Sequence, residues 1–190
     1  MRLFVAVDVG ARVARAADAL VDELRARTAR LAPRARVTWI PAERMHLTLR
    51  FIGETDETTF RAIEAALAVR MAIPPFDVTV AGAGAFPSSG RPRVLWAGIS
   101  SGADTLSLLE REVTSRLEKV GLAPETKPYR PHLTLARIRD ASTLRSPELM
   151  TGLTDVVLGT IHVDASTLFE SRLSPQGPAH IGRQTTRLTG

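Results

Sequence analysis

The chain has no cysteine among its 190 residues, and this absence excludes several kinds of site at once. Disulfides, thiolate ligands to a metal ion and a cysteine nucleophile all require that side chain. Nothing in the composition points to an oxidising compartment, so a cytoplasmic location is the default expectation.

Apolar runs and lysine are scarce too. No run approaches the roughly 20 apolar residues that span a membrane, and residues 1–8 are too short and reach an acid too early for a secretion signal. Lys119 and Lys127 are the only lysines, so arginine carries nearly all of the positive charge, which exceeds the negative charge by five (25 − 20). Arginine suits phosphate oxygens and fits a nucleic-acid substrate. A GC-rich genome that favours arginine codons would produce the same composition.

What is present suits a packed fold. The hydrophobic fraction is 44 %, and the length fits one large domain or two small, closely packed lobes. Apolar periodicity predicts helices at residues 11–32, 56–70 and 101–120, and a loop with a short helix at 140–150. Strands are predicted at residues 2–8, 37–40, 46–52, 76–80, 93–99, 132–138, 154–158, 161–169 and 180–188. We interpret residues 1–190 as a single α+β domain of two similar, interlocking lobes related by an approximate two-fold axis.

The most informative feature is the tetrapeptide His-Leu-Thr-Leu, which occurs at residues 46–49 and again at residues 132–135. The copies lie 86 residues apart (132 − 46), in different halves, and hold two of the four histidines in the chain. Side chains alternate along a strand, so His46 shares one face with Thr48, and His132 with Thr134, while the leucines anchor the other face. We therefore expect the two strands to face each other across one cleft.

Two imidazoles and two hydroxyls around one cleft are the groups that acid–base chemistry on a phosphodiester requires. One imidazole activates water on one side of phosphorus and the other protonates the departing oxygen, because histidine titrates near neutrality. The threonine hydroxyls hold the non-bridging oxygens, and no metal ion is required. His162 and His180 lack this context and are interpreted as structural or exposed.

With these motifs the chain resembles the two-histidine (2H) phosphoesterases, and in particular the RNA 2′,3′-cyclic phosphodiesterases historically called 2′-5′ RNA ligases. The matching residues span nearly the whole chain: 1–7, 39–41, 45–49, 51–53, 129–137, 170–171 and Gly177. The resemblance implies a bilobal fold of antiparallel sheet with helices outside, a central cleft, no metal and no cofactor. It implies hydrolysis of a 2′,3′-cyclic phosphate at an RNA 3′ end to a 2′-phosphate. The RNA substrates that it implies include tRNA fragments. The reverse reaction would form a 2′-5′ linkage.

The resemblance also implies roles for the motif residues. His46 would be the general acid that protonates the departing 3′ oxygen, and His132 would be the general base that activates water. Thr48 and Thr134 would bind phosphate oxygens. The two motifs are identical, so the residues alone leave the assignment of acid and base open.

Three residues near the motifs are further candidates for substrate binding. The resemblance implies that Phe51 stacks on a base and that Arg137 contacts phosphate; Arg130, on the loop before the second motif, is a weaker phosphate candidate. Strict alternation places Phe51 and Arg137 on the leucine face, so either the strands end or bulge just before them or these residues are structural. We expect core packing for Phe51 and function for Arg137, since a buried arginine needs an anionic partner. At His180 the resemblance leads us to expect tyrosine.

Other interpretations stay open. The same fold could act on a small cyclic nucleotide or on a cyclic phosphate of ADP-ribose instead of RNA. The chain could bind RNA ends without catalysis, although binding alone needs no pair of titratable imidazoles. A zinc hydrolase is disfavoured, because cysteine is absent and neither motif has a second histidine at short ligand spacing. We expect a monomer.

Overall fold

The computed structural model describes residues 1–174 and 177–190, and its strands form one antiparallel sheet. The strands are β1 (Arg2–Asp8), β2 (Arg36–Trp39), β3 (His46–Glu54), β4 (Phe76–Phe86), β5 (Val94–Ser101), β6 (Leu133–Asp140), β7 (Val157–Val163), β8 (Ala165–Ser174) and β9 (Gly177–Arg187). The helices are α1 (Gly10–Leu31), α2 (Glu57–Ala68), α3 (Ala103–Lys119) and α4 (Ser146–Met150), with a 3₁₀ turn, η1, at Ala42–Arg44. Within the described residues, no helix is long and apolar enough to cross a membrane.

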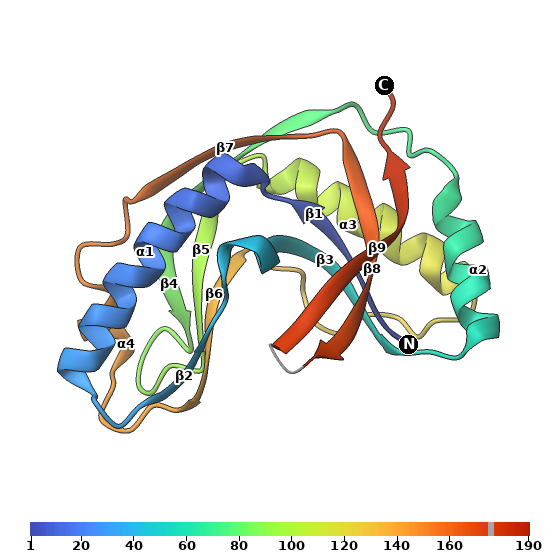
Figure 1. The fold of residues 1–190 in the computed structure, drawn as a ribbon. Coiled ribbons are helices and arrows are strands. Elements are labelled where there is room, and N and C mark those ends of the chain that lie inside the picture. The colour runs from blue at the N-terminus through green and yellow to red at the C-terminus, as the bar shows by residue number, and fades with distance from the viewer. Residues whose placement is uncertain (175–176) are drawn as a thin grey trace.

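The strand order is β7-β4-β5-β6-β3-β1-β8-β9, and β2 pairs with β6. The sheet bends into an arch, with α1 and α4 along one limb and α2 and α3 along the other (Figure 1). At the middle, Leu47 of β3 pairs with Leu133 of β6, and both are fully buried. Each of these leucines follows a motif histidine. The two leucines hold the same place in the two copies of the motif, and an antiparallel pair of equivalent residues lies on an approximate two-fold axis. The predicted α+β fold with two pseudo-symmetric lobes is therefore confirmed.

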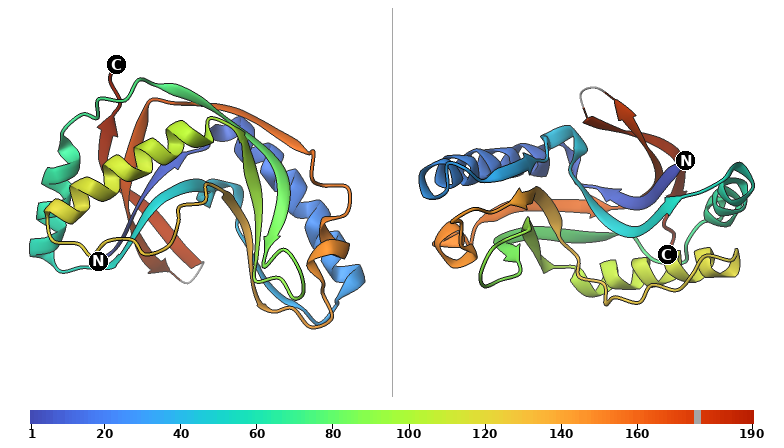
Figure 2. Two further views of the ribbon diagram at one scale, coloured as in Figure 1. Left: turned by 180° about the vertical axis from the view of Figure 1, so that it is seen from behind. Right: turned by 90° about the horizontal axis from the view of Figure 1, so that it is seen from below.

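The two lobes interlock, because two helices pack on the lobe to which their preceding strand does not belong. α1 follows β1 but packs on β7, and α3 follows β5 but packs on β3 and α2. In the view from below in Figure 2, α1 and α3 lie diagonally across the molecule from each other. A two-fold axis along the line of sight requires this arrangement.

Most predicted elements are present, and local sequence explains them. β1 buries residues 3–7, as expected of a first buried strand. α2 begins at the predicted cap, where the Asp56 carboxylate accepts a hydrogen bond from the Thr59 N–H at 2.7 Å. α1 and α3 each bury a stripe of apolar side chains at helical spacing. These helices cover the outside of the arch and leave its inner face to the site.

Several strand predictions were wrong in their bounds; the strand predicted at 154–158 begins only at Val157, as β7. β4 continues past residue 80, because its glycines permit close approach: a Cβ on Gly82 would lie 2.8 Å from the Thr154 carbonyl oxygen, and one on Gly84 would lie 2.3 Å from the Trp96 ring. The predicted strand at 161–169 is two strands, β7 and β8. They meet at a corner where the Asp164 carboxylate pairs with Arg187 at 2.5 Å.

Candidate active site

Both motif histidines are held by the same backbone contact. The Nδ1 atom of His46 lies 2.8 Å from the Arg44 carbonyl oxygen, and that of His132 lies 2.7 Å from the Arg130 carbonyl oxygen. A carbonyl oxygen only accepts, so Nδ1 carries the proton in each ring and Nε2 is the atom left for a ligand. In both copies the carbonyl belongs to the residue two positions before the histidine, so the lobes share this anchor as well as the motif.

A cleft of about 360 Å³ brings most of the predicted site residues together. Five of them line it: His46, Thr48, Phe51, Thr134 and Arg137. His132 is half-exposed and is not among the residues that line this cleft, but it stands two residues before Thr134, which does line it, on the same face of the chain. The Arg130 side chain is exposed and is not among the residues that line the cleft, although its carbonyl anchors His132.

A β-bulge in each motif strand explains why Phe51 and Arg137 face the cleft. The register of β1 against β3 slips opposite Leu49, and the register of β5 against β6 slips opposite Leu135. The last leucine of each motif is therefore an extra residue in its strand. Beyond it the alternation is shifted by one residue, so Phe51 and Arg137 lie on the same face as the histidine and threonine of their motif. Of the alternatives drawn from the sequence, bulged strands are the correct one. Core packing of Phe51 was wrong, because Phe51 is 59 % exposed.

Phe51 and Arg137 occupy equivalent places in the two lobes, each five residues after its histidine (51 − 46 and 137 − 132). One wall of the cleft thus carries an apolar ring where the other carries a guanidinium. The side chain of Arg137 is exposed, and its guanidinium forms no hydrogen bond or ion pair with another described residue. Its charge is therefore free for an anionic ligand.

The surroundings of the two histidines differ although their anchors match. His46 stacks on Phe4 with ring centroids 4.8 Å apart and faces the edge of His180 at 5.2 Å. His132 is half-exposed and meets the edge of Phe86 at 5.5 Å. Burial lowers the pKa of His46 to about 4, and the positive charge of His180 adds to that effect. His46 is therefore neutral at pH 7 in the free protein.

The loop before the second motif is fastened to the strand of the first. The Tyr129 hydroxyl donates to the Thr48 carbonyl oxygen at 3.1 Å. The buried Arg50 pairs with Glu125 at 3.0 Å and donates to the Ala123 carbonyl oxygen. These contacts position the loop that carries His132 relative to β3, so they help to set the separation of the two motifs.

Among the cleft-lining residues that sequence reasoning did not name as candidates are three that can carry charge: Arg2, Arg44 and His180. His180 was interpreted as structural or exposed, but it is half-buried in the cleft wall against His46. The one signal for it was its departure from the tyrosine that the resemblance led us to expect. His162 is exposed and pairs with Asp77 at 2.7 Å, in keeping with its structural interpretation.

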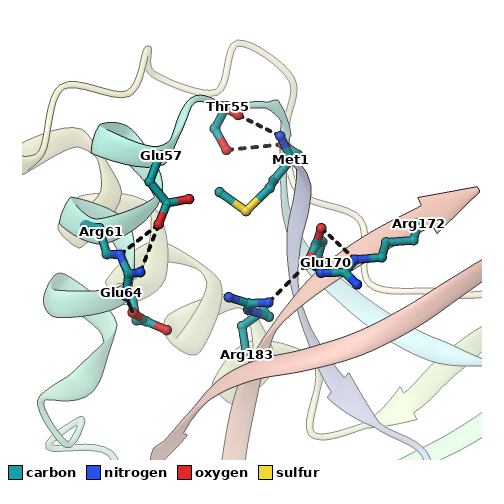
Figure 3. Close-up of polar contacts among 8 residues, drawn as sticks. All are labelled: Met1, Thr55, Glu57, Arg61, Glu64, Glu170, Arg172 and Arg183. Atoms are coloured by element: carbon teal, nitrogen blue, oxygen red, sulfur yellow. Dashed lines mark hydrogen bonds and ion pairs between the residues drawn. The ribbon is translucent and has the colours of Figure 1, made fainter.

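On the other face of β8, a buried carboxylate holds the hairpin that carries His180. Figure 3 shows Glu170 accepting two hydrogen bonds from Arg172, both at 3.0 Å, and one from Arg183 at 3.2 Å. The hydrogen bonds from Arg172 hold the pKa of Glu170 below its usual value. Arg183 also lies over the Phe60 ring of α2, 4.9 Å from its centroid. The β8–β9 hairpin is thereby fixed to α2, and its residues that face the cleft are fixed with it.

The cleft can supply acid–base chemistry from side chains of the chain itself. In the described ranges, 1–174 and 177–190, no group of three or more histidine, cysteine, aspartate or glutamate side chains is placed to hold a metal ion. The groups available for this chemistry are the Nε2 atoms of His46 and His132, the hydroxyls of Thr48 and Thr134 and the guanidinium of Arg137, and all of these residues except His132 line the cleft. Such a set can move protons at two points of a ligand while hydroxyls and a cation hold its anionic centre.

Doubled His–Thr pairs on a bilobal antiparallel sheet are features of the two-histidine phosphoesterases. The chain belongs to the 2′-5′ RNA ligase superfamily, which matches residues 13–172. Two relatives carry the name RNA 2′,3′-cyclic phosphodiesterase. The one from Aeropyrum pernix is 39 % identical over 73 % of this chain and 78 % of its own length, and the one from Methanothermobacter thermautotrophicus is 30 % identical over 99 % of each.

Solved structures agree with this family. Escherichia coli LigT complexed with 3′-AMP has a TM-score of 0.71 at 26 % identity, covering 100 % of this chain and 98 % of that one. TT0787 of Thermus thermophilus has a TM-score of 0.70 at 28 % identity, covering 98 % and 97 %. The family membership inferred from the sequence is confirmed.

Proposed function

We propose that this protein is a metal-independent phosphodiesterase that opens the 2′,3′-cyclic phosphate at an RNA 3′ end and leaves a 2′-phosphate. One observation carries the proposal: two His–Thr pairs, each with its imidazole anchored through Nδ1 to a backbone carbonyl, meet where the two lobes join. The names of the relatives from A. pernix and M. thermautotrophicus support the same reaction.

The reaction is a displacement at phosphorus, in which the attacking water and the departing oxygen lie on opposite sides. An approximate two-fold axis relates His46 to His132, so their Nε2 atoms approach one bound phosphate from opposite sides. His132 takes a proton from water as the P–O bond to water forms. His46 gives a proton to the 3′ oxygen as its bond to phosphorus breaks. Thr48 and Thr134 hold the non-bridging oxygens.

The low pKa of His46 bears on its role as the acid. In the free protein this imidazole is neutral at pH 7, because its pKa is about 4. A bound phosphate brings negative charge beside the ring, and negative charge favours the imidazolium form. His46 therefore takes up its proton with the substrate. Arg137 and Phe51, on opposite walls of the cleft, contact the phosphate and stack on the base.

The size of the cleft favours a second candidate substrate, a small cyclic nucleotide. Its volume of about 360 Å³ lies toward the lower end of the roughly 300–1,000 Å³ that is usual for small-molecule sites. The same acid, base and hydroxyl groups would hydrolyse that substrate. A series of cyclic-phosphate substrates from the mononucleotide to a decanucleotide distinguishes the two, because an RNA enzyme gains kcat/KM with length.

The test of the proposal is incubation with a short RNA that ends in a 2′,3′-cyclic phosphate, with EDTA present, followed by mapping of the product phosphate. We expect a 2′-phosphate, and no product from a His46→Ala, His132→Ala double variant. A 3′-phosphate product would contradict the assigned direction of ring opening. Binding without turnover would favour the RNA-end-binding module, and turnover that EDTA abolishes would favour a metal enzyme.

The reverse reaction belongs to the same proposal. Microscopic reversibility means that the groups that open the ring can also join a cyclic phosphate end to a 5′-hydroxyl. An RNA with a 5′-hydroxyl, supplied at high concentration, should therefore give a small yield of 2′-5′ linked product. The use of tRNA fragments, a monomeric state, a cytoplasmic location and the organisation of residues 1–190 as one domain stay predictions. Light scattering after gel filtration tests the monomer.

A further inference from the structure

The cleft wall beside His46 is completed by a third histidine. The ring of His180 on β9 lies edge-on to His46, with centroids 5.2 Å apart and planes at 73°. It makes the same kind of contact with Phe4, at 4.9 Å and 72°. Phe4 in turn stacks on His46 at 4.8 Å. The His46 ring is therefore held by a backbone carbonyl at Nδ1 and by two rings on its flanks.

We propose that His180 is a positioning residue for the phosphodiesterase reaction, which fixes the imidazole of His46 and controls when that ring takes up a proton. The kinetic part rests on the proposed function, whereas the contact itself requires no substrate. Among the described residues, the imidazole of His180 makes no hydrogen bond or ion pair, so its contacts with the rings of His46 and Phe4 are its defined side-chain interactions.

Charged groups border the pair formed by His46 and His180 from several elements. They are Arg2 and Asp8 of β1, Arg15 of α1, Glu43 and Arg44 of η1, and Arg137 of β6. Burial, with the nearby charge of Arg44, lowers the pKa of His180. The charge of His180 lowers the pKa of His46, but no such effect of His46 on His180 is resolved. Because the ring centroids lie 5.2 Å apart, a proton on His180 opposes a proton on His46.

His180 thus has two states that act differently on the reaction. When it is neutral, its ring edge only packs against His46. When it is protonated, it places a like charge 5.2 Å from the centre of the His46 ring and opposes a second proton there. Turnover requires one protonated and one neutral imidazole in the reacting pair, so His180 contributes to the low-pH limb of the pH–rate profile.

Two variants separate the charge of His180 from its ring. His180→Phe removes the charge and keeps an aromatic edge against His46, whereas His180→Gln removes both. His162→Phe is the matched control, because His162 is exposed and pairs with Asp77 outside the cleft. For each protein, the titration of His46 is followed by NMR of the imidazole, and kcat and KM are measured across about pH 4 to 9 on an RNA dinucleotide with a 2′,3′-cyclic phosphate.

We expect the midpoint of the His46 titration to rise by about half a pH unit or more in both His180 variants, and to stay unchanged in His162→Phe. The low-pH limb of the pH profile of kcat/KM, which reports groups of the free protein, should move by the same amount. At pH 7, kcat should fall further in His180→Gln than in His180→Phe, because only phenylalanine keeps the ring contact. KM should stay within about twofold of wild type, since His180 acts through His46.

An unchanged His46 titration in folded His180→Phe protein would overturn the proposal. A large rise in KM at unchanged kcat would overturn it too, because His180 would then be a substrate-binding residue. If His180→Phe does not fold, the titration in His180→Gln decides. If the wild-type protein hydrolyses no cyclic phosphate, the proposed function fails, while the NMR titration still tests whether His180 controls His46.

Discussion

His46 links the acid stability of the protein to its proposed catalytic role, and His46→Gln exposes that link. Burial lowers the pKa of His46 from 6.5 to about 4 in the folded state. Between these values the unfolded chain binds a proton at His46 and the folded chain does not. The free energy of unfolding therefore falls as the pH is lowered through this range. Glutamine has an N–H donor for the Arg44 carbonyl oxygen but does not titrate.

The magnitude follows from the difference between the two pKa values, 6.5 − 4 = 2.5. Each unit corresponds to about 1.4 kcal/mol, so the full loss is about 3.5 kcal/mol and is complete below roughly pH 4. The same linkage between proton binding and stability gives a loss of about 2.5 kcal/mol in the free energy of unfolding at about pH 4.5. Other titrating groups act alike in both proteins, so between pH 7 and pH 4.5 the wild type should lose about 2.5 kcal/mol more than His46→Gln.

Urea unfolding at the two pH values, followed by the fluorescence of Trp39 and Trp96, measures this difference. His162→Gln is the control, because His162 is exposed and its loss should leave the pH dependence of the wild type in place. Equal losses in the wild type and in His46→Gln would refute the reasoning. The folded state would then not keep this imidazole neutral, and the argument for proton uptake with the substrate would fall.

The remaining predictions concern turnover, binding and the single tyrosine. His46→Ala and His132→Ala should each lower kcat on a cyclic-phosphate RNA by about 10²- to 10⁴-fold, with unchanged circular dichroism, because each removes one proton transfer; near-normal turnover would rule out the two-histidine mechanism. Arg137→Gln should raise KM by about tenfold or more in initial-rate assays, as a charged contact to phosphate is lost. Phe51→Ala should raise KM without lowering Tm, because Phe51 is 59 % exposed. Tyr129 is the only tyrosine, and burial raises its pKa, so the tyrosinate absorbance of the folded protein should appear only above its usual value near about pH 10.

The sequence predicted the features that depend on neighbours along the chain. The apolar stripe of α1 and the cap at Asp56 are local patterns, and both lie where periodicity and cap chemistry placed them. The repeated tetrapeptide predicted two equivalent strands, and the pairing of Leu47 with Leu133 confirms their equivalence. Features of this kind need no knowledge of what lies across the sheet.

Features set by distant partners were beyond the sequence. The bulges at Leu49 and Leu135 arise in the pairing with β1 and β5, so strict alternation along either motif misplaces the residues that follow. For this reason Phe51 was assigned to the core. The hairpin of β8 and β9 packs on α2 and brings His180 to a histidine far away in the sequence. No local pattern around residue 180 signals that contact.

The two lobes repeat the same tetrapeptide and the same carbonyl anchor, so neither feature can give the two histidines different roles. The difference must come from side chains that the two-fold axis does not repeat. His46 is enclosed by Phe4 and His180, whereas His132 is half-exposed and meets one edge of Phe86. Acid–base catalysis needs one imidazole that gives a proton while the other takes one. The unequal surroundings of the two equal motifs can therefore separate the protonation states of the two rings, and the proposed function assigns the proton that arrives with the anionic substrate to His46.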